Sequence, residues 1–339
     1  MSRLSLTVVG AGLAMVLAAC ATQPQTVRRP AAADGATAWD PAFHAIVAAD
    51  ARVERLAGGF TWAEGPLWIE EDEALLFTDV PENRIHRWSP AEGASVFLEP
   101  SGYAGPDLDT LREPGANGLV AAPDGDVLMA NSGSRAIARL DLGTRRKTPL
   151  ATHYDGRRFN SPNDLVRRSD GRVFFTDPPY GLRGMAESPV RELPFSGVYR
   201  LDPGGRVVLL DASLRFPNGI ALAPDGRTLY VANSDPARPL WMAYALDAEG
   251  AVSGRRVFAD ASDLVADDAP GLPDGMAVAA DGTLFATGPG GVLVFAPDGR
   301  RLGRIAAGGQ VANCALDAGE RWLYLTAGHS LARIRLRPE

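Results

Sequence analysis

Short apolar runs alternate with acidic turn sequences along most of the chain, in a pattern that recurs six times. Each unit begins with Glu, Asn or Asp, continues with a short apolar run and reaches an acidic residue seven positions later, after which a second apolar run follows. The units begin at residues that we call the anchors: Glu64, Asn117, Asn163, Asn218, Asp274 and Asn313. In four units the acidic residue belongs to an Asp-Gly pair, a hairpin signal between β-type runs because glycine accepts a positive φ at no steric cost. Each unit therefore predicts two adjacent antiparallel strands.

The spacing of the anchors predicts the fold class. Neighbouring anchors lie 39 to 56 residues apart, which suits the four-stranded blades of a β-propeller and is too irregular for a tight solenoid. Strand-like runs between the anchors, at residues 85–90, 136–142, 197–203 and 206–211, supply outer strands. We expect an all-β protein, a six-bladed β-propeller with four-stranded blades.

The last unit has enough chain for only three strands, at residues 313–317, 321–327 and 331–337. A strand-like run at residues 51–56 is expected to supply the fourth strand and to close the ring by joining the last blade, which removes the exposed sheet edges. A helix that begins within residues 47–56 is the alternative for this segment.

The first 19 residues are expected to be a signal peptide. Arg3 gives a positive start, and the apolar run that ends at Ala19 is too short for a confident membrane span. The sequence Leu-Ala-Ala-Cys, which ends at Cys20, resembles the lipobox of bacterial lipoproteins, in which the cysteine is lipidated and becomes the mature N-terminus. An ordinary cleaved signal peptide with a chance cysteine is the alternative.

Residues 20–45 are expected to form the lipidated cysteine and a flexible tether, and residues 46–339 the propeller. Residues 21–40 are rich in Ala, Pro and Thr and hold few large apolar side chains, which is typical of linkers. We expect export and lipid anchoring on the periplasmic side, at the outer membrane because Ala21 rather than Asp follows Cys20. The lipid is the only expected contact with a membrane, and a monomer is expected because propellers of this size are self-contained.

Composition narrows the function classes. The chain has 34 Lys and Arg against 41 Asp and Glu, a net charge of −7. This argues against nucleic acid as a partner, because proteins that bind nucleic acid neutralise its phosphates with stripes of basic side chains. The only cysteines are Cys20 and Cys314, so lipid on Cys20 leaves no intramolecular disulfide. The sequence has no Gly-x-Ser-x-Gly motif, which argues against an α/β serine hydrolase.

The anchors are the candidate functional residues. The innermost strand of each propeller blade lines the central channel, so the six anchors should converge at one mouth of it. They comprise two carboxylates and four amides, the oxygen donors that hard divalent cations bind. Two buried acids that face each other would be costly without a cation. Asn and Asp also cap strand ends, so a capping role is the alternative.

Four segments carry a family resemblance: AEGPLW at 63–68, SPNDLV at 161–166, FPNGIAL at 216–222 and LPDGMAV at 272–278. In this order and spacing they resemble the SMP-30/gluconolactonase/luciferin-regenerating-enzyme family, over residues 50–338. FTDVPENRIHRW, FTDPPYGL and the C-terminal NCAL with LYLTAG look most like bacterial gluconolactonases. The resemblance implies a six-bladed propeller with one divalent cation, Ca²⁺ in most members and Zn²⁺ in some. It implies that Glu64, Asn218 and Asp274 bind the metal, with Asn163 at both metal and substrate.

The resemblance predicts a metal-dependent carboxylic-ester hydrolase that opens sugar lactones. The cation would act as Lewis acid on the lactone carbonyl, and Asp274 would serve as general acid and base. Asn163, Asn117, Asn313 and Tyr180 are the expected substrate contacts.

Two points stay open on the sequence. Animal members carry Arg-Phe directly before the Asn-Asp pair, and that arginine helps to bind substrate, whereas here Ser161-Pro162 stand there and Arg158-Phe159 lie upstream. The sugar-acid specificity therefore does not transfer. The alternative function is a non-catalytic, lipid-tethered propeller that binds a ligand or protein and holds a structural metal, and action on organophosphate esters is a third reading.

Overall fold

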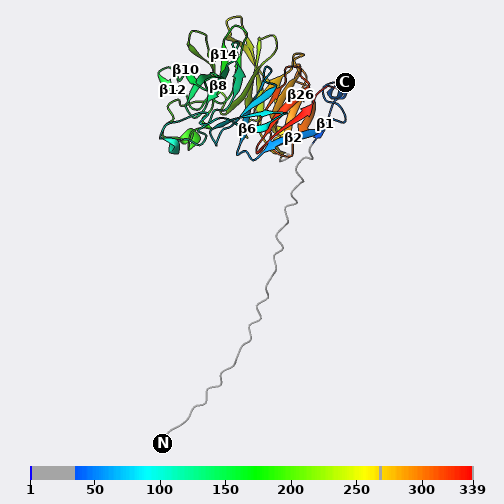
Figure 1. Ribbon diagram of the computed structural model, residues 1–339, viewed down its shortest axis with the longest axis horizontal. Coiled ribbons are helices and arrows are strands. Elements are labelled where there is room, and N and C mark those ends of the chain that lie inside the picture. The colour runs from blue at the N-terminus through cyan, green and yellow to red at the C-terminus, as the bar shows by residue number, and fades with distance from the viewer. Residues whose placement is uncertain (2–34, 267–268, 338–339) are drawn as a thin grey trace. The chain divides into compact units, whose positions relative to one another are not determined.

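A computed structural model of the chain describes residue 1, residues 35–266 and residues 269–337. Apart from Met1, the expected signal peptide, Cys20 and the tether as far as residue 34 fall outside this range. The described strands form six four-stranded antiparallel blades of a β-propeller, so the predicted fold class is confirmed (Figure 1).

The blades follow one another along the chain, and each begins with its innermost strand. Blade 1 contains β3 (Ala63–Ile69), β4 (Ala74–Asp79), β5 (Arg84–Ser89) and β6 (Gly93–Leu98). Blade 2 contains β7 (Leu119–Ala121), β8 (Val127–Asn131), β9 (Ala136–Leu140) and β10 (Lys147–Ala151). Blade 3 contains β13 (Leu165–Arg167), β14 (Val173–Asp177), β15 (Gly197–Leu201) and β16 (Val207–Asp211).

The second half of the ring repeats the arrangement. Blade 4 contains β17 (Pro217–Leu222), β18 (Thr228–Asn233), β19 (Leu240–Leu246) and β20 (Val252–Asp260). Blade 5 contains β21 (Met276–Val278), β22 (Leu284–Gly288), β23 (Gly291–Phe295) and β24 (Arg301–Ala306). Blade 6 contains β25 (Asn313–Leu316), β26 (Trp322–Ala327), β27 (Ser330–Arg335) and, as its outer strand, β2 (Val53–Gly58).

The pairing of β2 with β27 closes the ring, as predicted. Val53 pairs with Ile334 and Gly58 with Ser330, and in Figure 1 the blue β2 lies beside the red strands of blade 6. The innermost strands contact one another in the order β3, β7, β13, β17, β21, β25 and back to β3. They therefore surround a central channel.

The N-terminal segment is more ordered than the sequence suggested. Residues 35–45, which the prediction assigns to the tether, form β1 (Gly35–Ala38) and the 3-10 helix η1 (Pro41–Ala45). Strand β1 pairs with β24, with Gly35 opposite Ala306, and Phe43, 1% exposed, packs with Val47 into the core of blades 5 and 6. The predicted tether boundary at residue 45 is therefore wrong. Small residues give β1 no strand pattern, but the free edge of β24 offers it backbone partners.

The remaining elements are short: the hairpin of β11 (His153–Tyr154) and β12 (Arg157–Arg158), η2 (Leu108–Thr110), η3 (Met185–Glu187) and α1 (Ser262–Ala266). No helix in the described residues has the length and apolar character needed to cross a membrane. Two long connections carry η2 and η3, at residues 99–118 and 178–196. A β-bridge between Leu111 and Leu182 joins them.

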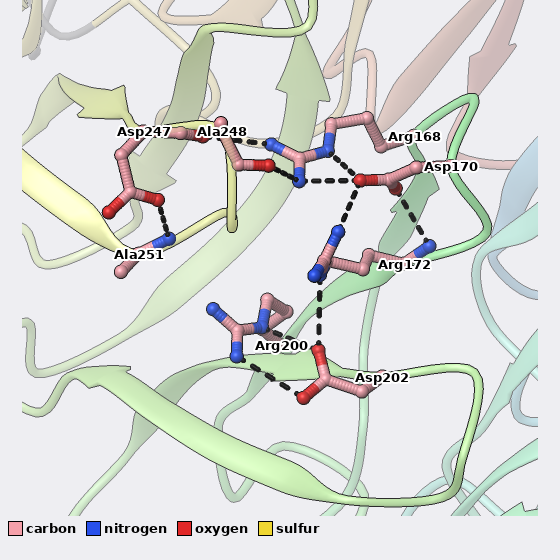
Figure 2. A network of polar contacts seen from close by, with 8 residues as sticks. All are labelled: Arg168, Asp170, Arg172, Arg200, Asp202, Asp247, Ala248 and Ala251. Atoms are coloured by element: carbon pink, nitrogen blue, oxygen red, sulfur yellow. Dashed lines mark hydrogen bonds and ion pairs between the residues drawn. The ribbon is translucent and has the colours of Figure 1, made fainter.

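A charged network joins the turns of blades 3 and 4 (Figure 2). Asp170 accepts from Arg168 at 2.6 Å and from Arg172 at 2.5 Å, and Arg168 also donates to the carbonyl oxygen of Ala248 at 2.9 Å. Because Arg168 and Asp170 follow β13 and the anchor Asn163 precedes it, this network lies at the opposite end of the inner strand from the anchors.

Candidate functional site

Five of the six anchors meet in one cavity. All six are buried, with exposed fractions between 4% and 8%. A cavity of about 390 Å³ is lined by Glu64, Asn117, Asn163, Asn218 and Asp274. These five residues come from five successive blades and stand at or just before the start of the innermost strands.

Hydrogen bonds to the backbone hold the anchors in place. The backbone N–H groups of Asn117 and Asn163 donate to backbone carbonyl oxygens at the end of the second strand of their own blade, at 2.9 Å in both cases. Threonines of the preceding blades hold anchor carbonyls: Thr78 Oγ1 donates to Asn117 at 3.2 Å and Thr176 Oγ1 to Asn218 at 2.6 Å. Asn117 is thus fixed both by its own blade and by the preceding one.

Glycines after the anchors let adjacent inner strands approach closely. A Cβ atom at Gly65 would lie 2.0 Å from the carbonyl oxygen of Asn117, and one at Gly219 would lie 2.2 Å from that of Asp274. Any side chain at these positions would push one anchor away from the next. The repeated glycine after an anchor is therefore a condition for a compact site.

The two anchor carboxylates are buried without a counter-charge. In the described part of the chain neither Glu64 nor Asp274 forms an ion pair. Burial, and then the repulsion from Asp164, raises the pKa of Glu64 to about 8, against hydrogen bonds from the Gly65 amide and Asn313. Burial and the repulsion from Glu64 raise the pKa of Asp274 well above its usual range. The cavity therefore favours a cation or protons near these oxygens.

The donor set fits a hard divalent cation. The Oδ1 atom of Asn117 is buried and has no hydrogen-bond partner within the described residues, which is costly unless another group binds it. Two carboxylates would nearly balance a divalent charge, and amide oxygens complete the shell that Ca²⁺ prefers. No group of three or more His, Cys, Asp or Glu side chains that could hold a metal occurs in the described ranges, so such a site here depends on its amides.

Asn313 is the one anchor that is not among the lining residues of the 390 Å³ cavity. It lines a second cavity of about 280 Å³ with Asp164, and its side chain hydrogen-bonds to both Glu64 and Asp164. That Asn313 contacts substrate stays a prediction; in this structure its amide holds two acids. The sequence could not separate this role because Asn313 has the same repeat position as the others.

Tyr180 lies in the wall of the 390 Å³ cavity. Its ring stacks on Phe216, with ring centres 5.7 Å apart and planes inclined by 16°. Burial raises the pKa of its hydroxyl. The aromatic wall also includes Trp62, and such faces suit the C–H surface of a ring-shaped ligand.

Sequence reasoning missed an ion pair in the same cavity. Arg112 Nη2 lies 2.7 Å from Glu113 Oε1, and the Arg112 side chain is 52% exposed whereas that of Glu113 is 11% exposed. Both backbone amides donate to the carbonyl oxygen of Gly181, at 2.8 and 3.2 Å, which docks the two long connections together. Neither residue belongs to the repeat, so only their place on an unusually long connection could have suggested a role.

Arg158 does not reach the cavity. Its Nη2 donates to the carbonyl oxygen of Ser134 at 3.1 Å, and Phe159 is fully buried in the core of blades 2 and 3. The arginine of the cavity is Arg112, from a different connection.

A larger cavity lies elsewhere but lacks these features. It measures about 690 Å³ and lies among the turns of blades 3 and 4, where Arg168 is already bound to Asp170 and to backbone carbonyls. We therefore assign the site to the smaller cavity that holds the anchors.

Comparison with known proteins gives a match over most of the fold. Residues 62–329 match the sequence family described as the SMP-30/gluconolactonase/LRE-like region. A gluconolactonase of Zymomonas mobilis is 42% identical over 305 residues, which cover 89% of this chain and 86% of that protein. A pentonolactonase of Haloferax volcanii is 30% identical over 248 residues, 71% of this chain and 72% of that protein.

A solved structure agrees with these matches. The structure of a gluconolactonase from Xanthomonas campestris superposes with a TM-score of 0.77 at 32% identity, and the match covers 91% of this chain and 96% of that one.

Proposed function

This chain belongs to the SMP-30/gluconolactonase/LRE-like family, and on that premise we propose that it is a carboxylic-ester hydrolase that opens sugar lactones with the help of a divalent cation. Lactone-opening activity is named for both relatives above. The observation that carries the proposal to this chain is that four buried residues, Glu64, Asn163, Asn218 and Asp274, line one cavity.

These four residues are the proposed cation site, with Ca²⁺ as the expected ion and Zn²⁺ as the alternative. A cation bound there would supply Lewis-acid polarisation of the lactone carbonyl. All four side chains offer oxygen donors, and all four residues are buried.

Asp274 is the proposed general base and acid. It takes a proton from water as the water oxygen bonds to the carbonyl carbon, and returns that proton to the ring oxygen as the ring C–O bond breaks. The product is the open-chain hydroxy acid. Without a cation, burial and the neighbouring Glu64 raise the pKa of Asp274. A bound cation would lower that pKa and keep the carboxylate ionised, in the form that can accept a proton.

The rest of the cavity would orient the substrate. The amides of Asn163 and Asn117 face the same space as the acids and suit sugar hydroxyls, while Trp62, Tyr180 and Phe216 provide apolar faces for the ring. A volume of about 390 Å³ leaves room for a monosaccharide lactone.

The test is a pH-stat assay of the purified protein on glucono-1,5-lactone and a small panel of other lactones, with spontaneous opening subtracted. EDTA treatment should abolish turnover, and Ca²⁺ or Zn²⁺ should restore it. Folded protein that turns over no lactone with any cation would instead favour a ligand-binding propeller.

We also propose that the protein is an exported lipoprotein, anchored through Cys20 on the periplasmic side at the outer membrane, and that it acts as a monomer. The lipobox-like sequence before Cys20 supports the anchor.

A further inference from the structure

Ser234 connects three parts of the cavity wall through one hydroxyl group. It follows β18 directly and is 9% exposed. Its Oγ donates to the carbonyl oxygen of Pro273 at 2.5 Å and accepts from Asn218 Nδ2 at 2.9 Å. The hydroxyl of Tyr180 also hydrogen-bonds to it. One side chain of blade 4 thus contacts an anchor, an aromatic residue and the backbone next to another anchor.

The chemistry of these partners fixes the orientation of the Asn218 amide. A serine hydroxyl has one proton to donate and two lone pairs that accept. The carbonyl of Pro273 can only accept, so the single proton of Ser234 is used there. The Asn218 atom that faces Ser234 must then be a donor, which is Nδ2, and Oδ1 lies on the other branch of the amide. A flipped amide would bring two acceptors together.

The same hydroxyl also reaches the neighbouring blade. Pro273 directly precedes Asp274, so the bond to its carbonyl oxygen holds the chain where it enters the anchor of blade 5. Asn218 and Asp274 are therefore set relative to each other by Ser234. We propose that Ser234 is a positioning residue that holds the Asn218 amide oxygen toward the cavity and so prepares the cation site, an inference that rests on the proposed function.

Blade 2 contains a natural comparison. Residues 130–132 and 232–234 are both Ala-Asn-Ser, and Ser132 Oγ donates to the carbonyl oxygen of Pro162 at 2.5 Å, just before Asn163. Ser132 thus makes the same bond to the neighbouring blade. Within the described residues, its hydroxyl makes no hydrogen bond to the side-chain amide of an anchor. Both serines bind a proline carbonyl, but only Ser234 binds an anchor amide. A comparison of variants that lack one hydroxyl or the other therefore separates the effects of these two contacts.

The experiment is a calorimetric Ca²⁺ titration of EDTA-stripped, dialysed protein, with the Ca²⁺-dependent rise in Tm as a second readout. We expect Ser234→Ala to weaken Ca²⁺ binding at least about tenfold, as loss of a ligand-orienting partner does. Asn218→Ala should weaken it at least as much. Ser234→Thr keeps the hydroxyl and should restore affinity to within about threefold.

Ser132→Ala is the matched control. It should lower Tm in the absence of Ca²⁺ about as much as Ser234→Ala, because each loses one bond to a proline carbonyl, while its Ca²⁺ affinity stays within about twofold of the wild type. Wild-type affinity in Ser234→Ala, or an equal loss in Ser132→Ala, would overturn the inference alone. If the wild-type protein binds no Ca²⁺, the proposed cation site fails and the inference fails with it.

Discussion

At the scale of single residues, four buried acids lie at the 390 Å³ cavity and the neighbouring 280 Å³ cavity. Over the whole residue, backbone included, each of these acids is at most 8% exposed: Glu64, Glu113, Asp164 and Asp274. Burial raises the pKa of each. Four ionised acids this close would repel one another. The folded state therefore holds protons or a cation in this region.

Asp274→Asn should separate folding from catalysis. The amide has nearly the same shape and leaves the backbone bonds of residue 274 intact, so Tm should change little. Turnover should fall about 10²- to 10⁴-fold, the usual contribution of a general base. Asp281→Asn, at the exposed turn of the same blade, is the control for the assay. Near-wild-type hydrolysis by the Asp274 variant would remove that carboxylate from the mechanism.

Glu113 gives a pH-dependent prediction. Burial raises the pKa of Glu113 to about 7, against the attraction of Arg112. The folded protein then holds a proton that the unfolded chain has released, so the stability from this group is present below about pH 4.5 and is lost as pH rises through 7. The side chain of Glu113→Gln cannot ionise, so this variant should not lose that stability as the pH rises.

The measurement is urea unfolding of both proteins in EDTA at pH 5 and pH 8. Relative to the wild type, Glu113→Gln should gain on the order of 3 kcal/mol between the two pH values. A difference that is the same at pH 5 and pH 8 would show that Glu113 is already ionised at the lower pH.

At the scale of elements, the close approach of inner strands is the feature that assembles the site. Gly219→Ala would place a methyl group 2.2 Å from the carbonyl oxygen of Asp274, so blades 4 and 5 must move apart. We expect a loss of about 1–3 kcal/mol in stability from overpacking and weaker Ca²⁺ binding. Gly204→Ala is the control, because its Cβ would meet no atom within 4 Å. Urea unfolding and Ca²⁺ titration of both variants check this.

The strands were predictable from sequence because each depends on a local pattern. Paired apolar runs recur in every inner hairpin, with an Asp-Gly turn in four of the six, and the run at residues 51–56 overlaps β2. Strand β1 was not predictable, because the sequence Gly-Ala-Thr-Ala has no apolar alternation and its pairing depends on the edge that β24 offers. A local pattern cannot report a partner that lies far along the chain.

The same distinction holds for the site. The anchors were found because the repeat places them at equivalent positions, and five of them line one cavity. Arg112 and Glu113 were missed because their places depend on how the two long connections dock, as in the bridge between Leu111 and Leu182. Ser234 was missed because the partners of its hydroxyl, Asn218 and Pro273, are distant in sequence. Asn313 shows that the repeat alone does not place a residue in the cavity. It has the same repeat position as the other anchors but lines a different cavity.

At the scale of the whole molecule, the proposed lipid on Cys20 would determine where the enzyme is located, by attaching it to a membrane. Cys20→Ser removes the thiol that would carry the lipid, so the variant should move from the detergent-extracted membrane fraction to the soluble fraction with unchanged activity per molecule. Cys314→Ser is the control, because this thiol is buried in the propeller and the variant should stay with the membrane. Immunoblots of fractionated cells and the mass of the mature N-terminus measure both. An unchanged membrane fraction for Cys20→Ser would contradict the anchor.

The pairing of β2 with β27 has a consequence for the newborn chain. A ribosome makes β2 near the beginning of synthesis and β27 near its end, so β2 must wait while five blades emerge. A product released before Ser330 lacks β27, and its ring stays open with the edge strands of blade 6 unpaired. Such edges attract proteases and chaperones. Closure of the ring is therefore coupled to synthesis of β27, because β2 has no strand of blade 6 to pair with until β27 has been made.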